Sequence, residues 1–152
     1  MSTNLEAFDE LVAQLRELFF ALRGVTARML VDLDCTAVER GVLYEIDRLG
    51  PQTVPAMARA RAVSRQAMQK TIDRLVARRW LRAEPNPSHA RSPLIALAPA
   101  GQKAYATIRA REAAALGAAR LPVGAAELRR TTQTLAQLST FFAQFEPTRS
   151  SR

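Results

Sequence analysis

The side chains with the clearest chemistry lie in the stretch from Ser64 to Leu75. Its charged and amide-bearing residues recur at positions that fall on one side of a helix: Arg65, Gln66, Gln69, Lys70, Asp73 and Arg74. Guanidinium, ammonium and amide groups are suited to base edges and phosphates. The other side carries an apolar stripe at three-to-four residue spacing, formed by Met68, Ile72, Leu75 and Val76. With Ser64 as its cap, this stretch predicts a short helix with one buried face and one face suited to DNA.

Other kinds of chemistry have little support in the sequence. His89 is the only histidine and Cys35 the only cysteine, so one chain cannot assemble a zinc site of several His or Cys ligands. The sequence also shows no motif that would build a Ser-His-Asp triad around this single histidine. The six glycines are scattered and form no phosphate-binding loop. We therefore expect a protein that is not an enzyme and holds no cofactor or metal. We expect His89 in a loop that can contact phosphate, whereas Cys35 is either a small core residue or a thiol that senses oxidants.

The composition bounds the size and the partners of the fold. With 152 residues, 48% of them hydrophobic, the chain can form one compact domain. Nine basic and two acidic residues lie between positions 54 and 92, whereas the first 50 residues carry five basic and nine acidic ones. This local basic excess is typical of a nucleic-acid binder. No stretch resembles a membrane span and the first residues do not resemble a signal peptide, so we expect a cytoplasmic protein.

Helices must position the basic face, and two are predicted before it. Apolar residues recur over residues 5–22 in steps of three and four, which predicts an amphipathic helix ending near Gly24. Its apolar stripe is too wide to be covered by one small partner. Thr36 and Glu39 have the spacing of a capping box, which predicts a second helix that runs to Gly50.

The segments on either side of the basic face complete a small motif. Residues 53–60 open with a proline in the first turn, which predicts a short third helix. Only residues 61–63 separate it from the cap at Ser64, and so tight a turn predicts a helix-turn-helix with the recognition helix second. Residues 81–83 and 94–97 are short strand candidates joined by a proline-rich loop. Together they predict a hairpin, or wing.

Two more helices are expected after the wing, the first over residues 100–116 and the second ending near residue 145. The predicted fold is mainly α with a small β wing: about six helices plus a two-stranded hairpin, arranged as a winged helix-turn-helix. We take residues 1–152 as a single domain, with the winged helix-turn-helix in residues 36–98.

Four short motifs mark this order of elements: Val63-Ser64-Arg65-Gln66, Ile72-Asp73-Arg74-Leu75, Asn86-Pro87 and Arg91-Ser92. Together with the long helices on both sides, they resemble the MarR family of winged helix-turn-helix transcription regulators over roughly residues 5–145. The resemblance implies a homodimer in which residues 5–24 and 100–146 form the dimerisation helices. It also implies double-stranded DNA as the partner, with a pseudo-palindromic target whose half-sites lie about 10 base pairs apart.

The resemblance also implies roles for single residues. The recognition helix would contact the major groove or its phosphates through Ser64, Arg65, Gln66, Gln69, Lys70 and Arg74. From the wing, Arg91 would reach the minor groove or the backbone, and His89 could contact phosphate. Asp73 would hold Arg91 by a salt bridge and so position the wing, because an acid on this surface would otherwise repel phosphate.

The sequence departs from the family at four positions. His89 stands where the wing usually carries an acid, two residues before its arginine. Ala62 and Arg79 stand where glycines are frequent, so each would be strained by on the order of 1 kcal/mol if its φ is positive. Ala98 replaces the usual threonine cap of the helix after the wing, which predicts a weaker helix start.

The interpretation that follows is a homodimeric DNA-binding transcription regulator, acting as a repressor that a small molecule releases. Related regulators bind lipophilic or phenolic effectors, and Phe19 and Tyr44 could line such a pocket; aromatic residues at helical spacing are also ordinary core. Two alternatives stay open. A winged-helix module could use the basic face to bind an acidic protein, or Cys35 could sense oxidants, as a cysteine of the first helix does in some relatives.

Overall fold

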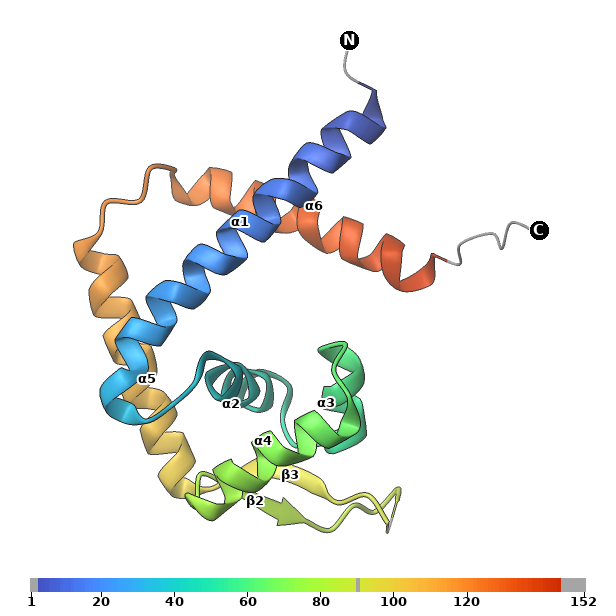
Figure 1. The fold of residues 1–152 in the computed structure, drawn as a ribbon, viewed down its shortest axis with the longest axis vertical. Helices are drawn as coiled ribbons and strands as arrows, with labels where there is room; N and C mark the ends of the chain where they lie inside the picture. Colours follow the sequence, from blue (N-terminus) through green and yellow to red (C-terminus); the bar gives the residue numbers. More distant parts are fainter. Residues whose placement is uncertain (1–2, 90, 146–152) are drawn as a thin grey trace, which may run out of the picture. The chain divides into compact units, whose positions relative to one another are not determined.

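The computed structural model describes residues 3–89 and 91–145. Within them the chain forms six α-helices, one short 3-10 helix and three strands (Figure 1). In chain order these are α1 (Asn4–Leu30), η1 (Val31–Leu33), α2 (Ala37–Leu49), β1 (Gln52–Thr53), α3 (Val54–Ala60), α4 (Arg65–Ala77), β2 (Leu81–Glu84), β3 (Leu94–Leu97), α5 (Pro99–Ala118) and α6 (Ala125–Gln144). The predicted fold class, mainly α with a small β wing, is confirmed. The chain divides into two compact units, Met1–Ala113 and Ala114–Arg152.

Side-chain caps explain where the central helices begin. The hydroxyl of Thr36 accepts a hydrogen bond from the backbone N–H of Glu39 at 3.2 Å, and the Glu39 carboxylate accepts one from the N–H of Thr36 at 2.8 Å. Thr53 caps α3, and Ser64 caps α4 by accepting from the N–H of Ala67 at 3.1 Å. Each cap satisfies an N–H that the first helical turn leaves without a partner. The predicted starts of all three helices are confirmed.

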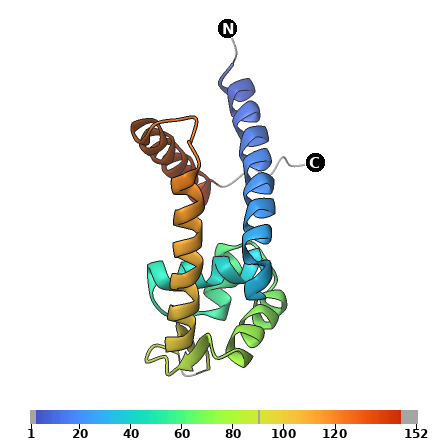
Figure 2. The ribbon, with the colours of Figure 1, turned by 90° about the vertical axis from the view of Figure 1, so that its left-hand side faces the viewer.

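The core of the first unit lies between α2, α3, α4 and the sheet, and Figures 1 and 2 show these elements gathered at one end of α1. Its large fully buried side chains come from every one of these elements, with one residue each from α1 and α5: Leu30, Val42, Leu43, Met57, Met68, Ile72, Leu75, Leu81 and Ile108. Burying a side chain of this size contributes about 1.5–3 kcal/mol. The buried side of α4 therefore fixes which of its residues face outward.

Two expectations about the helices are wrong in detail. α1 continues six residues beyond Gly24, to Leu30, because Leu30 is fully buried and draws the last turn into the core. The chain then leaves the helix through η1 and the left-handed backbone of Asp34, whose φ is +47°. On α4, Val76 is 40% exposed, and Thr71 instead completes the buried stripe.

The sheet has three strands, not the two expected. β3 lies between β1 and β2 and pairs antiparallel with both; Leu81 faces Leu97 in one ladder and Gln52 faces Ile95 in the other. A strand of two residues is too short to show alternating hydrophobicity, which is why periodicity missed β1. The β2–β3 hairpin is confirmed, and β1 anchors it to the helix-turn-helix.

Strained backbone occurs where the sequence lacks the expected glycines. Ala62, in the turn between α3 and α4, has φ of +51°, and Arg79, just after α4, has φ of +60°. The condition for strain at these two positions, a positive φ, is therefore met. These residues adopt a left-handed conformation that favours glycine.

Within the described part of the chain, no helix is long and apolar enough to cross a membrane.

Candidate nucleic-acid interface

The outward side of α4 presents the charged and amide groups predicted for DNA contact. Six polar residues of this helix are exposed: Arg65, Gln66, Gln69, Lys70, Asp73 and Arg74. We call them the α4 face. Its cap, Ser64, is exposed as well. Because Met68, Ile72 and Leu75 are buried on the other side, the helix cannot rotate without exposing its apolar stripe. The core therefore holds the α4 face toward solvent.

Asp73 has a different partner from the one expected. Its Oδ1 accepts a hydrogen bond from Nε2 of Gln69 at 2.7 Å, one helical turn earlier. Among the described residues no ion pair joins Asp73 to Arg91, so the structure does not bring these two side chains together. In this arrangement Asp73 restrains the amide of Gln69. Its expected role in holding Arg91 stays a prediction.

The wing loop keeps its shape through Asn86. The Asn86 Nδ2 donates to the backbone oxygen of Ser92 at 2.8 Å, and its Oδ1 accepts from the N–H of Ser88 at 3.1 Å. The backbone N–H of His89 donates to the backbone oxygen of Asn86 at 3.2 Å. These bonds close the loop on both sides of Ala90, which lies outside the described residues. His89 and Arg91 are both exposed on this loop, as expected for groups that could contact phosphate.

Arg74 forms an ion pair with Glu39, a residue that the sequence indicated only as part of a helix cap. Its Nε lies 3.4 Å from Oε1 of Glu39, an ion pair between α4 and the first turn of α2. The Glu39 side chain is 4% exposed, whereas that of Arg74 is 59% exposed. The Thr-x-x-Glu spacing identified Glu39, but its contact with residue 74 depends on how the helices pack.

Arg78, just after α4, also joins distant segments and was missed by the sequence reasoning. Its guanidinium donates to the backbone oxygen of Leu33 at 2.8 Å and to that of Asp34. It also lies over the ring of Trp80, 3.8 Å from the centroid, in cation–π geometry. The left-handed turn at Asp34 presents these carbonyls, so the end of the recognition helix is tied to the end of α1.

The turn of the helix-turn-helix has its own anchor. The Nε of Arg61 donates to Oε2 of Glu45 on α2 at 2.9 Å. The Arg61 guanidinium lies against Gly41, where a Cβ would come within 2.7 Å of it. A side chain at position 41 would therefore push this arginine away from Glu45.

Phe19 and Tyr44, the two residues expected to line an effector pocket, are both exposed, and their role in such a pocket stays a prediction. Phe19 is 56% exposed on α1 and Tyr44 is 41% exposed on α2, where Arg40 and Arg48 lie over its ring. A cavity of about 450 Å³ lies between α2, the sheet and α5, and a second of about 470 Å³ lies on α6. Neither includes Phe19 or Tyr44.

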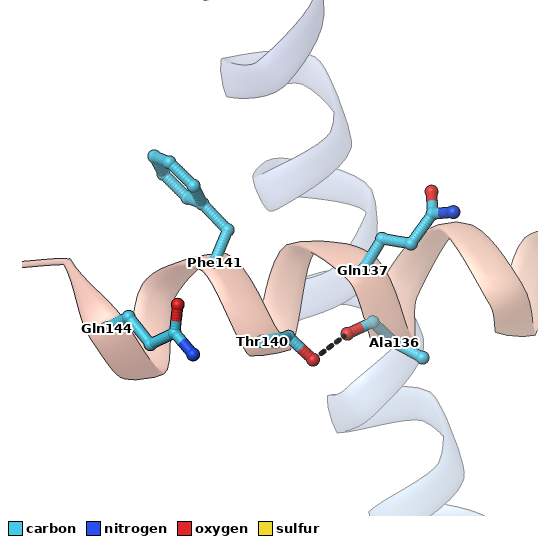
Figure 3. Close-up of a pocket in the computed structure, with 5 residues that line it drawn as sticks. All are labelled: Ala136, Gln137, Thr140, Phe141 and Gln144. Carbon is cyan, nitrogen blue, oxygen red and sulfur yellow. Dashed lines mark hydrogen bonds between the residues drawn. The ribbon is translucent and has the colours of Figure 1, made fainter.

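The cavity on α6 is lined by residues of that helix alone. All five of its lining residues come from a single stretch of that helix, as Figure 3 shows: Ala136, Gln137, Thr140, Phe141 and Gln144. The hydroxyl of Thr140 is already bonded to the Ala136 oxygen at 3.0 Å. Such a surface lacks the enclosure that small-molecule sites usually have.

Cys35 lies in the core and not at the surface. It is 6% exposed, and its thiol contacts the backbone oxygen of Thr36 at 3.6 Å. Burial, followed by the nearby charge of Glu39, raises the pKa of the Cys35 thiol to about 11. A neutral, buried thiol reacts slowly with oxidants, which favours the core interpretation. Within the described residues no group of three or more His, Cys, Asp or Glu side chains could hold a metal ion.

Comparison with known proteins agrees with this geometry. Residues 33–92 match the model of the MarR family. Similar solved structures include a MarR family transcription regulator, with a TM-score of 0.72 and 24% identity over 91% of this chain and 92% of that one. A mutant of MarR from E. coli in complex with operator DNA has a TM-score of 0.67 and 20% identity over 90% and 99% of the two chains.

A further similar structure is the overoxidised AbfR bound to DNA, with a TM-score of 0.67 and 18% identity over 91% of this chain and 96% of that one. At these identities the structural likeness concerns the fold. No curated protein matches the chain. The matched segment runs from η1 through α4 to the wing. It therefore includes the α4 face. The helix-turn-helix and wing segment of this chain, residues 33–92, therefore matches the MarR family, and the fold of the chain is similar to that of solved MarR-type winged-helix structures.

Proposed function

We propose that this protein is a transcription regulator that binds double-stranded DNA as a homodimer, through the α4 face and the wing. The α4 face carries the proposal, because three cations and two amides lie exposed on one side of a helix whose other side is buried. Such a helix fits the major groove, where guanidinium and amide groups can bind base edges. The exposed Arg91 on the wing can contact the neighbouring backbone.

The homodimer is supported by apolar side chains that the described chain leaves in solvent. In α1 only Leu30 is buried, and large apolar residues stay exposed along this helix: Leu5, Val12, Leu15, Leu18, Phe19, Phe20, Leu22 and Val25. In α6, whose described residues include no buried one, Leu128 and Phe141 are exposed. Apolar surface of this extent usually marks an interaction site. A second copy would cover it and place two α4 helices about 34 Å apart, one turn of DNA.

The proposal is tested by selecting bound duplexes from a random-sequence pool and measuring affinity for the winner and for an unselected duplex. We expect a pseudo-palindromic winner with half-sites about 10 base pairs apart. Lys70→Ala should weaken binding to both duplexes alike if this cation holds phosphate. Gln66→Ala should weaken binding to the winner and spare the unselected duplex. Arg109→Ala is the matched control, since Arg109 is an exposed cation of α5, outside α4 and the wing.

Failure to enrich any sequence would refute sequence-specific binding. If the α4 variants behaved like Arg109→Ala, the α4 face would not be the DNA-binding surface. Either result would support the alternative in which the basic face binds an acidic protein. A protein-binding module of that kind would need the basic face but would show no preference for any DNA sequence.

Repression, release by a lipophilic or phenolic effector, and location in the cytoplasm stay predictions. Transcription in vitro from a template that carries the selected site tests the first two. Repression predicts less transcript when the protein is added, and effector release predicts that a phenolic compound restores it. Cell fractionation tests the third. The wing role of Asp73 and the oxidant-sensing alternative for Cys35 also stay predictions.

A further inference from the structure

The buried carboxylate of Glu39 is engaged on both of its oxygens. Oε2 accepts the hydrogen bond from the N–H of Thr36 at 2.8 Å, which closes the capping box of α2. Oε1 lies 3.4 Å from Nε of Arg74 on α4. Because the cap fixes the first oxygen and the core surrounds the side chain, the second oxygen has a fixed position too. It is the partner of a cation that belongs to the α4 face.

This contact occupies one edge of the Arg74 guanidinium and leaves another open. A guanidinium carries five N–H groups, and in Arg74 the nitrogen that forms the ion pair with Glu39 is Nε, which carries only one of them. The four on the two terminal nitrogens form a fork that can donate two parallel bonds. Since the Arg74 side chain is 59% exposed, this fork is accessible to a ligand in front of α4.

A long arginine side chain loses much rotamer freedom when it is ordered. An arginine that is already held by a fixed carboxylate loses less when it binds DNA, because part of that ordering has occurred in the free protein. The bidentate acceptor that best matches the terminal fork is guanine, through O6 and N7.

We propose that Glu39, a residue outside the recognition helix, is a positioning residue that holds Arg74 so that its terminal fork donates to one guanine in each half-site. The proposal rests on the DNA-binding function proposed above. It adds a specificity determinant that the α4 face alone would not indicate.

Removing the charge of Glu39 should have opposite effects on two DNA affinities, that for an unselected duplex and that for the selected duplex. A negative charge close to DNA repels phosphate, so its removal should leave binding to an unselected duplex unchanged or slightly stronger. Its removal should also free Arg74 and weaken binding to the selected duplex. A residue needed only for folding would weaken both together.

Glu39→Gln separates these effects while preserving the helix. A glutamine at this position can still accept the hydrogen bond from Thr36, since either Glu or Gln completes a capping box. Glu112→Gln is the matched control. Glu112 pairs with Arg40 of α2 at 2.7 Å, is 16% exposed, and its ion pair joins α2 to α5 without touching α4.

The experiment repeats the selection from a random-sequence pool with the wild type, Glu39→Gln, Arg74→Ala and Glu112→Gln, each in the full chain. We expect Glu39→Gln and Arg74→Ala to lose preference for the same guanine and to keep the other preferred bases. Affinity of Glu39→Gln for the wild-type winner should fall roughly tenfold, with no loss on an unselected duplex. Glu112→Gln should select the wild-type sequence.

The proposal is overturned if Glu39→Gln selects the wild-type sequence, if it weakens all positions evenly, or if Arg74→Ala leaves every base preference intact. It is also overturned if Glu112→Gln changes the selected sequence in the same way as Glu39→Gln. These results differ from failure of the proposed function, in which the wild type itself enriches no sequence.

Discussion

Gly101 allows α5 to approach the backbone of Trp80, just before the wing, more closely than any side chain would permit. A Cβ at this position would lie 1.9 Å from the carbonyl oxygen of Trp80, 2.7 Å from its carbonyl carbon and 2.9 Å from its Cα. All three are backbone atoms, so no side chain can turn aside to make room. Real Cβ contacts do not fall below 3.0 Å, so Gly101→Ala must move this carbonyl by about 1.1 Å.

The loss of stability expected for Gly101→Ala follows from the contacts that a shift of the Trp80 carbonyl disturbs. Overfilling a packed site destabilises by about 1–3 kcal/mol. The Trp80 oxygen also accepts the N–H of Ala98 at 2.9 Å, and losing that bond removes about 1 kcal/mol. The greater helix propensity of alanine offsets this by about 1 kcal/mol. We therefore expect Gly101→Ala to lower the free energy of unfolding by about 1–3 kcal/mol.

The assay is denaturation in urea, followed by circular dichroism and by the fluorescence of Trp80, the only tryptophan. All variants are compared at one protein concentration, because dimerisation would make stability depend on it. Gly117→Ala is the matched control, since it lies in the same helix and a Cβ there meets nothing within 4 Å. That variant should be more stable than the wild type, by about 0.5–1 kcal/mol. If Gly101→Ala is as stable as Gly117→Ala, our account of the contact with Trp80 is wrong.

Three further predictions concern single residues of the first unit. Ala62→Gly should stabilise the protein by up to about 1 kcal/mol in urea denaturation, because glycine removes the strain at φ of +51°; a loss of stability would contradict this. Arg78→Ala should destabilise by about 1–3 kcal/mol and shift the Trp80 emission, because it removes the bonds to Leu33 and Asp34 and the contact with the ring; unchanged emission would argue against that contact. The pKa of Cys35, raised from 9.0 to about 11, means that between these pH values the unfolded chain ionises while the folded chain keeps its proton. The free energy of unfolding should therefore fall more steeply from pH 9 to 11 in the wild type than in Cys35→Ala, and equal slopes would refute it.

Local rules predicted the parts of this fold that depend on neighbouring residues. The caps at Thr36, Thr53 and Ser64 each involve a side chain and a backbone group three residues later, so spacing alone reveals them. The exposed face of α4 follows from helical periodicity in the same way. Positive φ at Ala62 and Arg79 was indicated only by the resemblance, since glycines are frequent in the family at these two positions.

The contacts that join distant segments could not be predicted in this way. Arg78 meets Leu33 and Arg40 meets Glu112 across 45 and 72 residues of sequence. Glu39 carried a local signal, the capping box, but its second partner on α4 depends on the packing of α2 against that helix. The end of α1 shows the same limit, because Gly24 is a local stop signal that the burial of Leu30 overrides.

The central claim is that the exposed cations of α4 and the wing neutralise DNA phosphates. The most direct test is the affinity for the selected duplex as the salt concentration rises from 50 to 200 mM. If two copies contact roughly six to ten phosphates, affinity should fall by about 10³–10⁵, with a logarithmic slope of about −5 to −9. A slope close to zero would contradict the claim, because no binding surface made of these side chains could engage DNA without releasing counterions.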